Sequence, residues 1–217
     1  MDRGGERPVS PRLPVLSAAE RAEIARLWER KLEQERRGLP RSDRHRNLEP
    51  VSAELLAVLA AGCGAERLLE VGGSSGLSTI ALAAAARASG ARLTSIEIEP
   101  MRQAEARETL TRLGLIAHAT LVCADAAAVL PSLAPSGLVL LDCEKLDYVR
   151  FARMLNLVEG GLIVADNVIS HDMKDWIHWV RARDGAESVT LPVGKGIEIT
   201  RLPRGLQAGR SASQAGG

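Results

Sequence analysis

Apolar residues beyond position 66 occur in short runs that alternate with alanine-rich stretches of helical length. The runs at 68–71, 93–96, 120–123, 138–141 and 162–165 are typical of buried parallel strands. Between and after them, the sequence predicts helices over 78–88, 101–113, 126–133, 148–158 and 172–183. This alternation indicates an α/β fold with a doubly wound, mostly parallel sheet.

The two ends of the chain follow other patterns. Two further strands, at 187–192 and 197–202, are joined by only Val-Gly-Lys-Gly, so they predict an antiparallel hairpin. Near the start, Ser17 and Glu20 have the spacing of a capping box, which predicts an amphipathic helix to about Arg37. A second helix is expected over 52–61. We divide the chain into a flexible arm (1–16), a helical extension with its connector (17–47), the main domain (48–202) and a disordered tail (203–217).

Composition excludes several classes of protein. The formal net charge is +1, and three Trp, one Tyr and one Phe leave few rings for stacking on bases, so no nucleic-acid partner is expected. The three cysteines are widely spaced, which fits neither a disulfide framework nor a zinc site. We expect no membrane span and a cytoplasmic protein. The Arg-rich connector 41–46 is more typical of a solvated loop than of a phosphate-binding patch.

A glycine-rich turn follows the first strand of the main domain. Glu70, Gly72, Ser74, Gly76 and Ser78 mark this turn and the start of the next helix. Glycines there let the backbone approach a nucleotide-like ligand at the strand ends. Because a dinucleotide fingerprint needs glycine where Ser74 stands, NAD is disfavoured, and no Gly-Lys-Ser/Thr follows to make a P-loop. A plain strand-to-helix turn is the alternative.

Acidic residues also follow the second and third strands. Glu97, about twenty residues past the glycines, is placed to accept hydrogen bonds from two ribose hydroxyls. Glu99, before Pro100, is better explained as a helix-capping acid. After the third strand, Asp125 and Ala126 could recognise an adenine amino group, and an N-cap role for Asp125 explains the pattern nearly as well.

The ends of the fourth and fifth strands carry a second acidic cluster. Asp142 follows one strand, and Asp166 and Asn167 follow the next, so pairing of these strands would bring the carboxylates about 5 Å apart. A hard divalent cation would relieve their repulsion and leave positions for water and substrate. Capping of a turn and a helix is the alternative explanation.

Together these motifs resemble the catechol and caffeoyl-CoA type O-methyltransferases over roughly residues 48–202. The resemblance implies a seven-stranded class I methyltransferase sheet, S-adenosylmethionine over the 72–76 turn, and Mg or a similar ion on Asp142, Asp166 and Asn167. Lys145 would be the base that accepts the hydroxyl proton, with surface pairing to Glu144 as the alternative. The cofactor-binding residues expected are Glu70, Gly72, Ser74, Gly76, Ser78, Glu97, Ile98, Asp125, Ala126 and Asp142.

Some features depart from the family pattern. Only four residues separate Asn167 from the helix expected at Asp172, whereas many relatives have a longer loop there. Lys195 replaces a frequent Asp in the last turn, which the implied fold places far from the chemistry. His171 is a candidate auxiliary base. Trp176 and Trp179, at helical spacing, are expected to pack inside the protein or against a second subunit.

The leading hypothesis is metal-assisted methyl transfer from S-adenosylmethionine to a hydroxyl of a small molecule, such as a catechol-like vicinal diol. A methyltransferase for tRNA or protein is the second hypothesis, although the Asn/Asp-Pro-Pro-Tyr/Phe motif of many N-methyltransferases is absent. A cofactor-binding protein without activity is the third. The resemblance and the amphipathic first helix also lead us to expect a homodimer.

Overall fold

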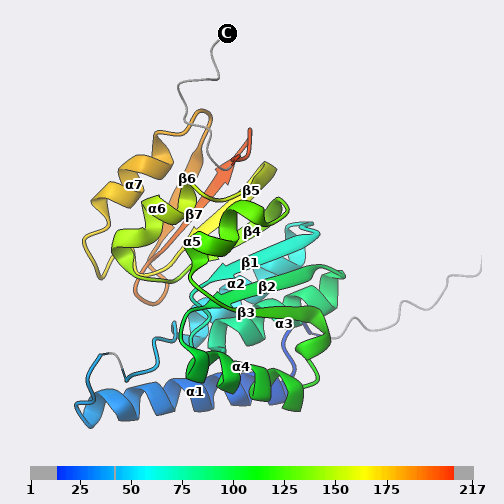
Figure 1. Cartoon of the computed structure of the whole chain (residues 1–217), viewed down its shortest axis with the longest axis vertical. Coiled ribbons are helices and arrows are strands. Elements are labelled where there is room, and N and C mark those ends of the chain that lie inside the picture. The colour runs from blue at the N-terminus through cyan, green and yellow to red at the C-terminus, as the bar shows by residue number, and fades with distance from the viewer. Residues whose placement is uncertain (1–13, 42, 208–217) are drawn as a thin grey trace, which may run out of the picture.

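The computed structural model describes residues 14–41 and 43–207, and seven strands form a single mixed sheet (Figure 1). The strand order is β3-β2-β1-β4-β5-β7-β6. β1 to β5 run parallel, and β7 pairs antiparallel with both β5 and β6. The fold and the terminal hairpin are therefore as predicted. The strands are β1 Arg67–Val71, β2 Arg92–Glu97, β3 Ala119–Cys123, β4 Ser136–Leu141, β5 Leu157–Ala165, β6 Glu187–Leu191 and β7 Ile197–Leu202.

Helices cover both faces of the sheet. Alternate residues of β4 enter two apolar clusters: Leu138 and Leu140 pack with α1, α2 and α3, whereas Val139 and Leu141 pack with α6 and α7. This division follows from the alternation of side chains along a strand. The helices are α1 Ala18–Arg36, α2 Pro50–Gly62, α3 Leu77–Ser89, α4 Pro100–Arg112, α5 Ala126–Val129, α6 Tyr148–Ala152 and α7 Lys174–Arg181, with short 3-10 turns η1 Ile116–His118, η2 Leu130–Ser132 and η3 Lys145–Asp147.

Two helix predictions were wrong in extent. The helix expected over 148–158 ends at Ala152, and β5 begins at Leu157, where the chain pairs with Ser136 and Leu206. These pairings lie far away in the sequence, so local periodicity carries no sign of them. The helix expected over 126–133 is divided: α5 ends at Val129, and the short η2 that follows contains Pro131, which lacks the N–H that a continuing helix needs.

The N-terminal helix α1 confirms the capping box: Ser17 N donates to Glu20 Oε2 at 2.7 Å, and Glu20 N donates to Ser17 Oγ at 3.2 Å. α1 packs on α2 and α3 of its own chain, so its apolar face is covered without a second subunit. The expected homodimer therefore stays a prediction. Within the described residues, none of the helices is both long and apolar enough to cross a bilayer.

The predicted arm and tail lie mostly outside the described residues. The described part of each is packed: Leu16 is buried in the core, and Leu206 forms a bridge with Leu157. The division into arm, helical extension, main domain and tail stays a prediction.

The sheet order places a crevice between neighbouring strands. The chain winds outward from β1 through β2 to β3 and, in the other direction, from β4 to β5, so the connections diverge between β1 and β4. Ligands of open α/β sheets bind at the carboxyl ends of the strands at such a point. Both sequence-predicted clusters, the glycine turn and the acid pair, lie at that edge.

Candidate functional site

The glycine turn 72–76 joins β1 to α3 and presses against the end of β4. Gly72 has φ +96°, and a methyl group added there would overlap the carbonyl oxygen of Asp142. Glycine alone permits both the backbone conformation and this close approach. Ser74 also has a positive φ, +47°. The turn is thus a tightly constrained piece of backbone at the crevice floor.

Glu97 at the end of β2 holds this turn in place. One carboxylate oxygen accepts the N–H of Ser74 at 2.7 Å, and the other accepts the N–H of Glu99 at 2.9 Å. The side chain is 6% exposed and still borders the crevice. Glu99 occupies the N-cap position of α4, as predicted, although its side chain makes no capping hydrogen bond within the described residues.

Three of the residues predicted to bind the cofactor lie in or next to the turn and do not line the crevice. Glu70 is fully buried, and its Oε2 accepts hydrogen bonds from Thr79 Oγ1 at 2.6 Å and Ser95 Oγ at 2.5 Å. Burial raises the pKa of Glu70. Gly76 is the N-cap residue of α3, and Ser78 is buried in the first turn of that helix. Their part in cofactor binding stays a prediction, and the structure gives them a supporting position.

The other predicted residues border a cavity of about 570 Å³, which we call the glycine-side chamber. Asp125 lines this chamber and also caps α5, since its Oδ1 accepts the N–H of Ala127 at 2.9 Å. The two alternatives for Asp125 are therefore compatible. From the prediction, the lining residues are Gly72, Ser74, Glu97, Ile98, Asp125, Ala126 and Asp142.

Asp142 and Asp166 follow adjacent positions of β4 and β5, because Leu141 pairs with Ala165 in the parallel register. Asn167 has φ +67° and donates its Nδ2 to Asp142 Oδ1 at 3.2 Å and to Asp166 Oδ2 at 2.7 Å. The sequence prediction of a close acid pair is confirmed. Neither Asp166 nor Asn167 caps α7, whose N-cap position is Met173.

The acid pair is electrostatically unfavourable by itself. Burial raises the pKa of Asp166 to about 8, and the nearby Asp142 carboxylate adds to the effect. Burial likewise raises the pKa of Asp142. Asp166 Oδ1 is buried and has no hydrogen-bond partner among the residues that the structure describes. A cation bound between two such carboxylates would offset their repulsion.

These oxygen donors fit a hard divalent ion. Coordination by Asn167 requires its carbonyl oxygen where the amide nitrogen now points, a change made by turning the amide over. The described residues contain no group of three or more His, Cys, Asp or Glu that could hold a metal. The candidate site therefore depends on two carboxylates and an amide, with further positions left for other ligands.

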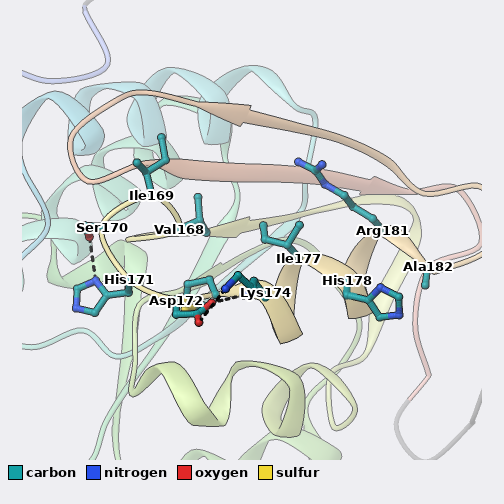
Figure 2. Close-up of a pocket in the computed structure, with 11 residues that line it drawn as sticks. Val168, Ile169, Ser170, His171, Asp172, Lys174, Ile177, His178, Arg181 and Ala182 are labelled. Carbon is teal, nitrogen blue, oxygen red and sulfur yellow. Dashed lines mark hydrogen bonds and ion pairs between the residues drawn. The ribbon is translucent and has the colours of Figure 1, made fainter.

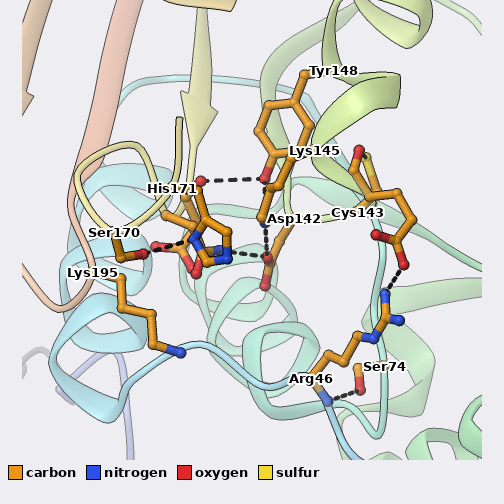
Figure 3. A network of polar contacts seen from close by, with 12 residues as sticks. Arg46, Ser74, Asp142, Cys143, Lys145, Tyr148, Ser170, His171 and Lys195 are labelled. Atoms are coloured by element: carbon orange, nitrogen blue, oxygen red, sulfur yellow. Dashed lines mark hydrogen bonds and ion pairs between the residues drawn. The ribbon is translucent and has the colours of Figure 1, made fainter. Parts of the chain in front are cut away.

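Lys145 lies beside the acid pair (Figure 3). Its Nζ is 3.4 Å from Asp142 Oδ1 and donates to Tyr148 Oη at 3.0 Å. Tyr148, at the start of α6, in turn donates to the backbone oxygen of Asp166 at 3.3 Å. The alternative pairing of Lys145 with Glu144 is not observed, because Glu144 forms ion pairs with Arg41 and Arg46. Tyr148 thus orients Lys145, a role that its position in the sequence did not reveal.

A second cavity, of about 190 Å³, surrounds the acid pair, and we call it the acid-side chamber. It shares Arg46, Asp142 and Cys143 with the glycine-side chamber, so the two chambers meet along one wall. Lys145, Asp166 and Asn167 line only the acid-side chamber of the two. A group bound in one chamber would therefore lie next to a group bound in the other.

Residues 41 and 43–47 line the two chambers, and the interpretation of the connector 41–46 as a solvated loop was wrong for its second half. His45 and Asn47 are buried. His45 Nε2 is 3.2 Å from Glu105 Oε2, and Asn47 Oδ1 accepts the hydroxyl of Ser75 at 3.1 Å. Arg46 N donates to Ser74 Oγ at 3.1 Å. The one sequence signal of this role is a dense run of polar side chains without helical or strand period.

The sequence prediction that the terminal turn between β6 and β7 lies far from the site was also wrong. Lys195 lines the acid-side chamber together with Lys145, so the turn is part of the site and not remote from it. The backbone oxygen of Lys195 accepts the N–H groups of Ile169 and Ser170, both at 3.1 Å. These bonds tie the turn to the loop after Asn167, and the same loop brings His171 to the chamber.

A more open hollow of about 950 Å³ lies between this loop and α7 (Figure 2). It shares only His171 with the acid-side chamber. α7 begins at Lys174, so the loop after Asn167 is slightly longer than predicted. Trp176 and Trp179 are buried in α7, and Trp176 packs edge-on against Tyr148 with ring centroids 5.7 Å apart, which confirms packing inside the protein.

Comparisons with known proteins agree with this arrangement. The chain is 34% identical over 130 residues to a catechol O-methyltransferase of Niastella koreensis, covering 57% of this chain and 58% of that protein. It is 37% identical over 121 residues to a catechol O-methyltransferase of Mycobacterium tuberculosis, covering 54% of each. The alignments thus span little more than half the length of these curated relatives.

Structural comparison gives the same fold. The SAH-bound methyltransferase PaMTH1 of Podospora anserina superposes with a TM-score of 0.71 at 19% identity, covering 86% of this chain and 88% of that one. A family model described as O-methyltransferase matches residues 30–201, which include the acid pair and both chambers' main walls. The chain therefore belongs to the O-methyltransferase family.

Proposed function

We propose that this protein transfers a methyl group from S-adenosylmethionine to a hydroxyl of a small, catechol-like molecule, with the help of a divalent cation. The observation that carries the proposal is the contact between the two chambers at Asp142. Methyl transfer requires donor and acceptor to be held in line at close range, and positioning supplies much of the rate of such a reaction.

The glycine-side chamber would hold the cofactor. Gly72 leaves the backbone open to close approach, and the Glu97 carboxylate keeps lone pairs for the ribose hydroxyls. Asp125 at the rim would accept the adenine amino group. The bound SAH of the Podospora anserina neighbour supports a nucleoside cofactor of this kind.

The acid-side chamber would hold the acceptor and the cation. Asp142, Asp166 and Asn167 are the residues that would bind Mg²⁺ or a similar ion, which supplies charge neutralisation and a lower hydroxyl pKa when bound. Lys145, oriented by Tyr148, would accept the hydroxyl proton at Nζ. The hydroxyl oxygen then forms a bond to the methyl carbon as the carbon–sulfur bond breaks, and S-adenosylhomocysteine leaves.

Methyl transfer from S-adenosylmethionine to a panel of catechols, followed by mass spectrometry with Mg²⁺ and with EDTA, tests the proposal. We expect a mono-methylated product with Mg²⁺ and little product with EDTA. Equal turnover in both conditions would contradict the role of the cation. Labelling of bulk tRNA or protein in place of the catechols would contradict the acceptor class. The proposed homodimer is tested separately by light scattering.

A further inference from the structure

The acid-side chamber carries more positive charge than its proposed chemistry uses. Its cationic side chains come from four parts of the chain: α1, the connector, the segment after β4 and the terminal turn. The acidic residues in its wall are Glu35, Asp142 and Asp166, and the proposed function assigns the last two to a cation. The cationic residues in the wall are Lys31, Arg41, Arg44, Arg46, Lys145 and Lys195.

Lys31 and Lys195 make the most unusual pair in this wall. Lys31 lies on α1 and is only 5% exposed. Burial lowers the pKa of Lys31, and the charge of the nearby Lys195 lowers it further, against the opposing effect of Glu35. Lys195, by contrast, is 38% exposed, and two like charges that line the same chamber favour an anion between them.

The acidic groups nearby satisfy these cations incompletely. Glu35 serves two of them, with its Oε1 3.1 Å from Lys31 Nζ and 4.0 Å from Arg44 Nη1. Lys195 Nζ is 3.9 Å from Glu49 Oε1, which is beyond hydrogen-bond distance. Lys195 therefore keeps donors for another acceptor. In Figure 3, Lys195 and Arg46 lie on either side of Asp142.

The dimensions of the chamber limit what that acceptor can be. At about 190 Å³ it is smaller than the usual range for drug-sized ligands, roughly 300–1,000 Å³. A single aromatic ring with one small charged substituent suits such a space. A carboxylate is planar and accepts hydrogen bonds from two ammonium groups at once.

We propose that Lys31 and Lys195 form a carboxylate subsite, so that the preferred methyl acceptor is a single-ring catechol that carries a carboxylate. The choice of a methyl acceptor rests on the proposed function. Binding of a carboxylate by the two lysines can be measured without any reaction. The hydroxyls would face Asp142 and Lys145, and the carboxylate would face Lys31 and Lys195. A neutral catechol of the same size would leave both ammonium groups without an anion.

The test compares 3,4-dihydroxybenzoate with its uncharged amide, by titration calorimetry of the full-length protein in the presence of S-adenosylhomocysteine and Mg²⁺. We expect the acid to bind at least about tenfold more tightly than the amide, as charge-assisted hydrogen bonds of this kind allow. Lys195→Met should bring this ratio close to one. Lys195→Glu should reverse it. Lys174→Met, which changes a lysine whose side chain is 88% exposed outside the chamber, is the matched control and should keep the wild-type ratio.

Lys31→Met tests the buried member of the pair, with a melting curve to verify folding; if it does not fold, the two Lys195 variants decide. Equal binding of acid and amide by the wild type, or an unchanged ratio in Lys195→Met, would overturn the subsite. Turnover separates the two proposals. Preferential binding of the acid without methylation of any catechol would support the subsite and contradict the proposed function. Methylation without preference for the acid would do the opposite.

Discussion

Glu97 and Asp166 are both buried carboxylates at strand ends of one crevice, and their surroundings differ sharply. Each oxygen of Glu97 accepts a backbone N–H, from Ser74 and from Glu99. Asp166 has one oxygen without any hydrogen-bond partner, and a second carboxylate, Asp142, lies beside it. Both oxygens of Glu97 are already engaged by the backbone, whereas one oxygen of Asp166 has no hydrogen-bond partner among the described residues.

Glu97 therefore stabilises the backbone around it, whereas the pair of Asp142 and Asp166 leaves one carboxylate oxygen unsatisfied. A hydrogen-bonded carboxylate stabilises the turn around it. An unsatisfied acid pair lowers the stability of the fold. Such pairs are typical of functional sites, and this one lies where the two chambers meet. Substitutions at the acid pair should therefore affect stability and activity in opposite directions.

The largest effect is expected for Asp166→Asn. Removal of one carboxylate should lower methyl transfer by about 10³-fold, since the site loses its charge toward the cation. In EDTA the same variant should be more stable than the wild type by about 1 to 2 kcal/mol, because a buried repulsion disappears. Activity assays and thermal melts measure the two effects.

The pH dependence sharpens this prediction. The pKa of Asp166 is raised to about 8 in the folded protein, from an ordinary value of 3.8. Its contribution to stability is therefore most favourable below pH 3.8 and is lost as the pH rises toward 8. The stability gained by Asp166→Asn should accordingly grow from pH 5 to pH 8. Asp184→Asn, at an exposed residue, should show no such trend, and a destabilised Asp166→Asn would contradict the contrast.

The next effect concerns Lys145, which joins the acid pair to Tyr148. Lys145→Met should lower kcat by roughly 10²-fold or more, the range expected when a proton acceptor is lost. Binding of S-adenosylhomocysteine should change little, because Lys145 does not line the glycine-side chamber. Single-turnover assays and calorimetry test the two parts. An equal loss in cofactor affinity would show that Lys145 acts through the fold.

Much of this contrast could be predicted from the sequence. Asp142 and Asp166 each follow an apolar run, and parallel pairing brings such positions together at one edge. Gly72 and Gly76 also marked a turn that needs glycine, and both have positive φ. These features depend on local pattern and on the regular geometry of a sheet, which explains why they were found.

The basic residues in the wall of the acid-side chamber could not be predicted in the same way. Lys31, His45 and Lys195 come from α1, the connector and the terminal turn, and only the packing of these segments brings them together. Their helix, loop and turn patterns give no information on which distant segment each will contact. The early start of β5 could not be predicted for the same reason, because Leu157 pairs with the distant residues Ser136 and Leu206.

Gly72→Ala tests how closely the two regions are joined. The added methyl group would overlap Asp142 O, and the backbone is at φ +96°, so we expect a loss of about 1 to 3 kcal/mol or more in unfolding free energy. Gly64→Ala is the matched control, because it has φ +73° with no atom within 4 Å of the added group. The difference between the two in chemical denaturation isolates the close approach. Equal losses would show that backbone strain alone explains the effect.

The smallest expected effect concerns Glu23, which lines neither chamber. Its contribution to stability should change with pH in the opposite direction to that of Asp166. Hydrogen bonds from Arg26, and then from Arg112, lower the pKa of Glu23 on α1 to about 2 from 4.5. Its contribution to stability is present above pH 4.5 and is lost as the pH falls toward 2.

Because both arginines are about half exposed, solvent screening should reduce the effect of Glu23→Gln at pH 7 to a loss of about 1 kcal/mol in unfolding free energy. That loss should shrink steadily as the pH falls toward 2. Glu54→Gln, which removes an exposed partner of Arg21, should cost less at pH 7. Chemical denaturation across this pH range makes the measurement. If Glu23→Gln became more stable with rising pH, as Asp166→Asn should relative to the wild type, then burial would dominate at both carboxylates and the contrast between satisfied and unsatisfied acids would fail.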